Sequence, residues 1–296
     1  MKIYGSLLSL CVLQATSAFT VQAPNNAFST ALNSDRYGNS AIRDTPVRDN
    51  FREGEMGSMR GQGQRRSTED AWETLSPITV QGGSLRTCSF NEGVERVTVL
   101  MATEGRPLMS NVELWQGPDN TPQKMAVYLE DGNVRPFRCT VETPGSSNAI
   151  SIRNTAEMEY PLSAGIEADM ETIGPAKTVD PSTARIVQGG AVYTLPFAPN
   201  VASVQVMLKT DGRPLNARVE LLQGPNNNKQ VMDIYTEDGD ERSFFAIIET
   251  PGVGNVVRIV NTATVEFPLT AYVEPYLIRN DSLESRREEG AGMTWS

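Results

Sequence analysis

The chain has 296 residues, which is room for two ordinary domains that each bury a core of their own. Acidic residues outnumber basic ones by 36 to 26, and this argues against nucleic acid as a partner because phosphate binding needs clustered lysine and arginine. Histidine is absent from the sequence, so neither a Ser-His or Cys-His catalytic pair nor an imidazole metal site can form. We expect no catalytic residue, no cofactor and no metal.

The N-terminus has the pattern of a removable targeting segment. Lys2 precedes a short apolar run that ends near Leu13, and the small residues Ala15-Thr-Ser-Ala18 follow. This predicts a signal peptide over residues 1–18, too short to remain in a bilayer as an anchor. A buried N-terminal strand is the alternative. Because no later apolar run reaches membrane length, we expect no membrane span.

Residues 19–66 are rich in serine, asparagine, alanine, glycine and arginine and show little apolar periodicity. Such a segment buries too little surface to offset its chain entropy, so we expect a disordered N-terminal leader. Its junction, Ala15-Thr-Ser-Ala-Phe19, is similar to the bipartite plastid leader of algae with secondary plastids, diatoms in particular. That similarity implies a plastid location. Secretion is the alternative, and the sequon Asn280-Asp-Ser282 is compatible with it.

An internal repeat organises the rest of the chain. Residues 80–167 align without a gap on residues 187–274 at a constant offset of 107, and about half of the aligned positions are identical. A period of this length with two copies indicates two domains rather than a solenoid. We expect modules at residues 67–167 and 185–276, a linker at 168–184 and a C-terminal tail at 277–296.

Each copy carries short runs of alternating apolar residues between turn sequences such as Gly-Arg-Pro and Asp-Gly-Asn. This period-two pattern is typical of an antiparallel sandwich or barrel, and neither copy has a helical stripe. We predict an all-β fold of two tandem homologous antiparallel β-sandwich modules with about seven or eight strands each. The strands expected in the first copy span residues 84–90, 96–103, 111–116, 124–130, 136–142, 149–154 and 158–166.

The repeat also predicts the state of the two cysteines outside the leader. Cys88 corresponds to Leu195 and Cys139 to Ala246, so both positions accept an apolar side chain. We expect buried thiols that pack in the core rather than react.

Five residues are candidate contacts between copies of the chain. Arg106 and Arg213 occupy equivalent turns, where each either covers apolar surface locally or meets an acidic site on another module. Trp115 and its equivalent Leu222 should point to the face opposite the core, where a loop, the other module or another chain covers them. Trp295 near the C-terminus either belongs to a frayed end or anchors in a neighbouring subunit.

The repeated sequences Gly-Arg-Pro-Leu, Val-Glu-Leu-(Trp/Leu)-Gln-Gly-Pro, Glu-Asp-Gly and Glu-Thr-Pro-Gly, behind a diatom-type leader, resemble those of the pyrenoid shell proteins (PyShell) of diatoms and related algae. The resemblance covers about residues 75–275, and residues 112–120 are its most specific part. It implies a structural, non-enzymatic protein that self-associates into a homo-oligomeric sheet or tube at the pyrenoid periphery in the plastid stroma. Such a layer encases Rubisco and limits CO2 escape, so Rubisco or other pyrenoid proteins are possible further partners.

A tandem carbohydrate- or protein-binding module is the alternative function, because many paired β-modules are monomers that bind ligands. The two hypotheses differ in a simple observable, the size of the purified protein in solution.

Overall fold

A computed structural model describes residues 65–145, 147–168, 179–225 and 227–279, together with the backbone of residues 18–20. The predicted signal peptide except Ala18, nearly all of the leader, most of the linker and most of the C-terminal tail, including Trp295, lie outside the described residues. Among the described residues, no helix is long and apolar enough to cross a membrane.

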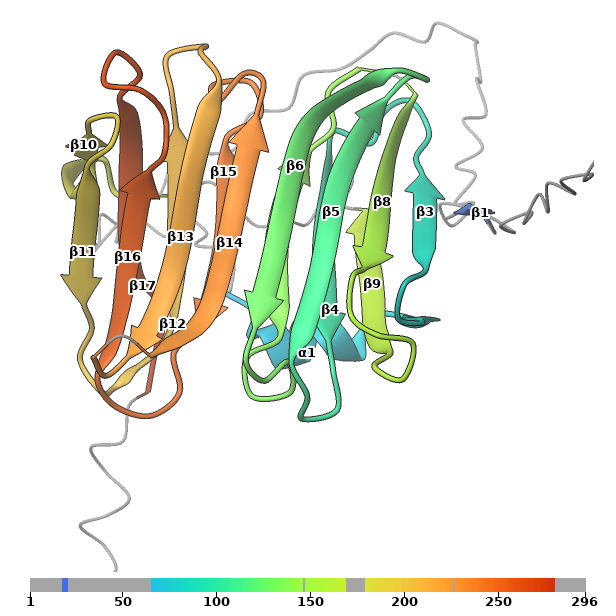
Figure 1. Ribbon diagram of the computed structural model, residues 1–296, viewed down its shortest axis with the longest axis horizontal. Helices are drawn as coiled ribbons and strands as arrows, with labels where there is room; N and C mark the ends of the chain where they lie inside the picture. The colour runs from blue at the N-terminus through green and yellow to red at the C-terminus, as the bar shows by residue number, and fades with distance from the viewer. Residues whose placement is uncertain (1–17, 21–64, 146, 169–178, 226, 280–296) are drawn as a thin grey trace, which may run out of the picture. The chain divides into compact units, whose positions relative to one another are not determined.

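The chain folds into two antiparallel sheets, apart from the parallel addition of β1 at one edge. The prediction of an all-β fold is confirmed. The first sheet, called sheet A, is seen face-on in Figure 1 and has the order β1 (Ala18–Thr20), β3 (Leu85–Ser89), β8 (Asn148–Asn154), β5 (Leu108–Gln116), β6 (Asn120–Leu129), β14 (Asn228–Thr236), β13 (Leu215–Gln223), β16 (Asn255–Asn261) and β11 (Val192–Pro196). The second sheet, sheet B, has the order β10 (Arg185–Val187), β17 (Leu269–Ile278), β12 (Val201–Lys209), β15 (Phe244–Glu249), β7 (Phe137–Glu142), β4 (Arg96–Ala102), β9 (Leu162–Ala168) and β2 (Ile78–Val80).

The alternation read from the sequence places one face of each strand in a core between the sheets. In β5, Leu108, Ser110, Val112 and Leu114 are buried, while Met109, Asn111 and Glu113 between them are more exposed. The core cluster contains residues of both sheets and of both repeats, and every buried apolar residue among the described ones lies between Ala71 and Val273. The stretch from Arg65 onward therefore supplies all the buried apolar residues that the structure describes.

Each repeat supplies half of each sheet, and both sheets continue from one repeat into the other. In sheet A, β6 pairs with β14, and in sheet B, β7 pairs with β15. Ala126 lies opposite Asp233 and Cys139 lies opposite Ala246, and each is a pair of residues equivalent at the offset of 107. A residue that faces its own equivalent marks a twofold axis, so a pseudo-twofold axis runs through both sheets at this seam.

The predicted strand at residues 158–166 is wrong at its start, because β9 begins at Leu162. The preceding residues form a loop held by the buried side chain of Asn154, whose Nδ2 donates to the carbonyls of Val80 and Tyr160 at 3.0 and 2.8 Å. Asn261 makes the same two contacts in the second repeat. This buried side-chain amide joins the end of β8 to β2 and to the loop before β9, and so fixes the conformation of the loop. The alternation of apolar residues along a strand does not predict such a contact.

Short elements at the margins were also not predicted. These are the edge strands β2 and β10, the helix α1 (Thr68–Glu73) and the 3-10 helix η1 (Pro181–Thr183). The helix starts with a capping box, in which Ser67 Oγ accepts from the Asp70 amide and the Asp70 carboxylate accepts from the Ser67 amide. At six residues it is too short to show an apolar stripe in the sequence.

Candidate assembly surfaces

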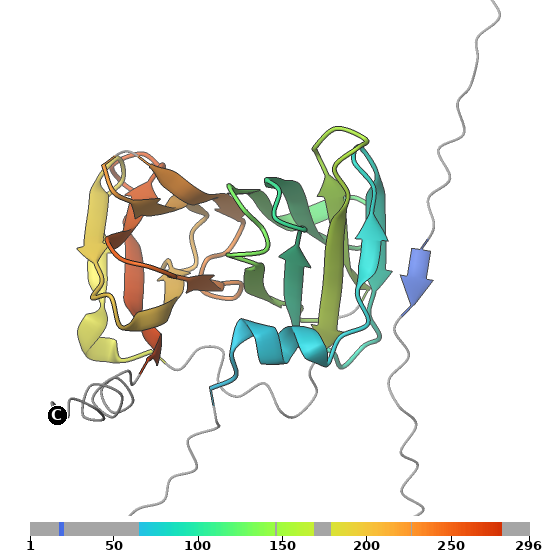
Figure 2. The same cartoon turned by 90° about the horizontal axis from the view of Figure 1, so that it is seen from below.

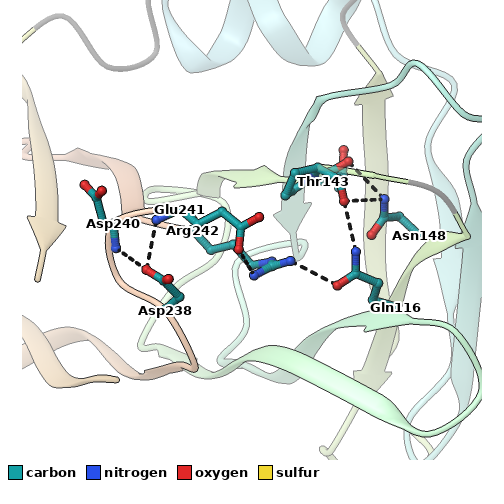
Figure 3. A network of polar contacts seen from close by, with 8 residues as sticks. Gln116, Thr143, Asn148, Asp238, Asp240, Glu241 and Arg242 are labelled. Carbon is teal, nitrogen blue, oxygen red and sulfur yellow. Dashed lines mark hydrogen bonds and ion pairs between the residues drawn. The ribbon is translucent and has the colours of Figure 1, made fainter. Parts of the chain in front are cut away.

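Two buried arginines cross the seam between the repeats. Arg135 donates from Nη2 to Gln223 Oε1 at 2.9 Å, and Arg242 donates from Nη2 to Gln116 Oε1 at 3.0 Å. These pairs are equivalent under the offset of 107, so the pseudo-twofold axis relates them. Figure 3 shows the second pair, in which Gln116 Nε2 also donates to the Pro144 carbonyl at 3.0 Å. The sequence signal for this contact is the identity of both the Gln and the Arg in the two copies.

The turn before each arginine is shaped by an aspartate. Asp238 Oδ1 accepts the amides of Asp240 and Glu241 at 2.9 and 3.0 Å, and Asp131 does the same in the first repeat. These two backbone hydrogen bonds lower the pKa of Asp238 below its ordinary value. The repeated Glu-Asp-Gly sequence thus forms a turn that aims the arginine at the seam. Among the described residues, no group of acidic side chains is arranged to hold a metal ion.

Arg106 and Arg213 occupy corresponding corners of the two repeats. Arg106 donates to the Glu159 carbonyl at 3.2 Å and lies over the Tyr160 ring at 5.9 Å. Arg213 repeats this with the Glu266 carbonyl at 3.1 Å and the Phe267 ring at 5.7 Å.

Both corners also present exposed apolar side chains beside these arginines. The equivalent residues Met158 and Val265 are 83% and 73% exposed. A small hollow lined by Arg106, Glu104 and Pro161 adjoins the first corner. Each arginine therefore covers apolar surface within its own repeat, beside an exposed apolar side chain.

Trp115 lies on the outer face of sheet A beside Glu113 and Ser151, and Leu222 occupies the equivalent position in the second repeat. Trp115 is half-buried, and its indole Nε1 donates to Glu113 Oε2 at 3.1 Å and to Ser151 Oγ at 3.3 Å. Leu222 is buried. Neither residue forms an exposed apolar anchor in this structure, and the rest of this face combines ion pairs such as Arg218–Asp233 with tyrosines at positions 128 and 235.

Residues 65–75 of the chain, called the strap here, include α1 and lie against part of the outer face of sheet B (Figure 2). Thr68 Oγ1 donates to Glu249 Oε1 at 2.6 Å, and the carbonyl of Arg66 accepts from Arg138 at 3.0 Å. Leu75 lies against Gly165, which has no side chain to obstruct it. Because Gly165 belongs to the first repeat and Glu249 to the second, the strap links the repeats across the seam.

Glu249 contacts the strap through Thr68, whereas its equivalent in the first repeat, Glu142, pairs with Arg96. Burial raises the pKa of Glu249 above its ordinary value, against the opposing effects of the Thr68 hydrogen bond and the Arg138 charge. The folded protein therefore holds this proton to a higher pH than the unfolded chain. The resulting cost to stability is absent below about pH 4.3, the unfolded value, and complete above the raised folded value.

We expect Glu249→Gln to raise the Tm at pH 7, because a neutral amide avoids the cost of burying a charge and its oxygen still accepts from Thr68. The gain should shrink as the pH falls toward 4. The matched control is Glu142→Gln at the equivalent position, where Glu142 instead pairs with Arg96 at 3.0 Å. That change should lower stability by about 0.5 kcal/mol. Thermal unfolding between pH 4 and 8 measures both, and a lower Tm for Glu249→Gln at pH 7 would contradict the assignment.

The profile of the diatom pyrenoid shell protein family matches residues 72–275, more than half of the chain and both repeats. This chain belongs to that family. Family membership indicates a structural, non-enzymatic role in the pyrenoid shell and a location in the plastid pyrenoid. The resemblance read from the repeated motifs is thereby confirmed.

Other comparisons add little. No curated protein sequence matches the chain at a significant level. Among solved structures, the chain is similar to one described as the atomic structure of Sulfolobus turreted icosahedral virus, with 10% identity, coverage of 69% of this chain and 91% of that one, and a TM-score of 0.23. It is also similar to a cupin 2 conserved barrel domain protein from Leptotrichia buccalis, with 12% identity, coverage of 68% and 82%, and a TM-score of 0.19. Neither similarity supports a functional conclusion.

Proposed function

We propose that this protein is a structural subunit that assembles with copies of itself into a protein layer around the Rubisco of the pyrenoid, at its periphery in the plastid stroma. Membership in the shell family supports this proposal. The layer would limit the escape of CO2, and Rubisco or another pyrenoid protein would lie against one of its faces.

The pseudo-twofold axis is the structural feature that suits the chain to this work. It presents each surface twice, at opposite ends of one body, so a single chain can join neighbours on two sides through related contacts. Contacts that do not close into a ring generate open arrays. We retain residues 67–167 and 185–276 as the proposed modules, because each range carries one set of eight equivalent strands, apart from the last residues of β9 and β17.

The test is the size of the purified chain from Arg65 to Ser296, which keeps the strap and the whole core. We expect sheets or tubes in negative-stain images and large particles in light scattering. The thiols of Cys88 and Cys139 are buried and form no disulfide, so assembly should not depend on a reducing agent. A monodisperse monomer at high concentration, across salt and pH, would refute self-assembly and leave the ligand-binding alternative.

A further inference from the structure

The two ends of the body carry equivalent sheet edges. In sheet A, β3 lies at the end formed by the first repeat and β11 at the end formed by the second, and β11 is β3 shifted by the offset of 107. In sheet B, β2 and β10 are related in the same way. At each end, equivalent residues set the spacing between the edge of sheet A and the edge of sheet B. A second copy whose sheet A edge meets that of the first therefore also brings the two sheet B edges together.

Strand direction allows these edges to join. From β3 to β11, sheet A contains eight strands, and each is antiparallel to the next. Sheet B also contains eight antiparallel strands from β10 to β2. An even number makes the two edge strands of each sheet antiparallel to one another. When one copy follows another in the same orientation, β11 meets the next β3 antiparallel, and β10 meets the next β2 antiparallel.

The backbone of β11 has unused hydrogen-bonding groups at this edge. The Asn261 amide donates to the Ala191 carbonyl, and the Phe197 amide donates to the Asn255 carbonyl, so the odd-numbered residues of β11 bond to β16. In an antiparallel pair the residues between them direct their N–H and C=O groups outward. These are Val192, Thr194 and Pro196, and no described strand pairs with them.

The edge of β3 has the same pattern. The Asn154 amide donates to the Ser84 carbonyl and the Phe90 amide to the Asn148 carbonyl, so Leu85, Thr87 and Ser89 face outward. This edge accepts a strand, because β1 pairs with it in parallel opposite Thr87 to Ser89. A chain that begins at Arg65 lacks β1 and leaves the edge open.

On the edge strands, the exposed large apolar side chains lie at the second-repeat end. Val192 on β11 is 56% exposed and Ile186 on β10 is 71% exposed. An unpaired edge with exposed apolar residues is a template for another chain, although β11 has only five residues and β10 three. Here Pro196 removes one outward N–H at the end of β11 but leaves those of Val192 and Thr194.

We propose that copies of this chain join end to end in rows, with β11 and β10 of one copy pairing with β3 and β2 of the next, so that both sheets continue across the junction. This rests on the proposed self-assembly and specifies how it occurs. The seam inside each chain provides the precedent, since it joins two repeats through a longer pairing in sheet A and a shorter one in sheet B. At that seam equivalent residues face each other, so Thr194 should face Thr87 of the next copy.

Cysteine cross-linking tests the junction and its register. Opposed residues in an antiparallel pair have Cα atoms about 4.5–5.5 Å apart, within the span of a disulfide. The double variant Thr87→Cys/Thr194→Cys of the chain from Arg65 should form a ladder of covalent multimers on a non-reducing gel after oxidation. Either single variant alone should form none, while a mixture of the two should give dimers. Dimers from Thr194→Cys alone would show that like edges pair and would overturn the head-to-tail arrangement.

Proline substitution tests the edge hydrogen bonds. Thr194→Pro removes an N–H that faces away from β16, so the fold should persist while row growth stops, seen as loss of sheets and tubes and a fall to single bodies in mass photometry. Thr194→Val keeps the N–H and should assemble as the parent does. If Thr194→Pro is folded by circular dichroism and still assembles fully, the edge proposal is wrong although self-assembly stands. If the parent chain itself stays monomeric, the proposed function and this inference fail together.

Discussion

Replacing Gln223 with leucine is expected to lower the free energy of unfolding by about 3 kcal/mol, because it removes the hydrogen-bond acceptor of a buried charge at the seam. Arg135 is 6% exposed, and its guanidinium donates to Gln223 Oε1. Its Nε lacks a partner already, and burial lowers its pKa despite the nearby charges of Glu130 and Asp131. Leucine supplies no acceptor, so the guanidinium loses its link across the seam.

The equivalent substitution is a built-in control for this loss. Gln116→Leu should cost less, because the partner Arg242 also pairs with Glu241 at 2.6 Å. Chemical denaturation of both variants measures the difference. Adding Arg135→Met to Gln223→Leu should recover most of the lost stability, since it removes the buried arginine charge and leaves an apolar pair. Equal losses in the two single variants, or no recovery in the double variant, would show that the seam does not depend on this pair.

The effect on assembly should follow from the same contact. Rows require both sheets of a copy to meet both sheets of the next, and the seam keeps the two repeats in one rigid body. A loosened seam lets the repeats rotate, so Gln223→Leu should give shorter or irregular assemblies at temperatures where it remains folded. The double variant should restore regular ones.

Much of the fold could be predicted from the sequence because its signals are local. Alternation such as that around Val97 and Val99 places side chains on one face of a strand, and the Gly-Arg-Pro and Asp-Gly turns separate the strands. The second repeat has an apolar residue at each cysteine position, which predicts that the two thiols pack in the core. Cys88 and Cys139 are indeed buried. Burial also raises the pKa of the Cys139 thiol far above its ordinary value, which makes it unreactive.

The joining of the repeats could not be predicted by such patterns. The pairing of β6 with β14 depends on which edges two modules leave open, and alternation within a strand does not specify its neighbour. The strap escaped prediction for a similar reason, since its few contacts, such as Leu75 against Gly165, connect positions far apart in the sequence. For the candidate contacts, the sequence placed Trp115 and Arg106 at the surface but could not show that each has partners in its own repeat.

Gly189→Ala should cause a second large loss of stability, about 3 kcal/mol, through crowding of the backbone. A Cβ at this position would lie 1.7 Å from the carbonyl oxygen of Thr264, far inside van der Waals contact, and Gly82 meets Glu157 in the same way. The neighbouring Gly190→Ala is the control, because it has φ of +76° but open space around it, and should cost only about 1 kcal/mol. Thermal unfolding should rank them in this order, and the reverse ranking would mean that the loop moves aside freely.

Gly189 also lies between β10 and β11, the two edge strands that are proposed to pair with the next copy. Gly189 lies in the turn from β10 in sheet B to β11 in sheet A, and Gly82 lies in the turn from β2 to β3. These turns set the offset between the two edges at each end of the body. A displaced turn at one end should therefore weaken end-to-end pairing beyond its effect on folding, and Gly189→Ala should assemble less than Gly190→Ala when both are compared well below their Tm. Assembly that depended instead on the outer face of sheet A would be the same in both variants.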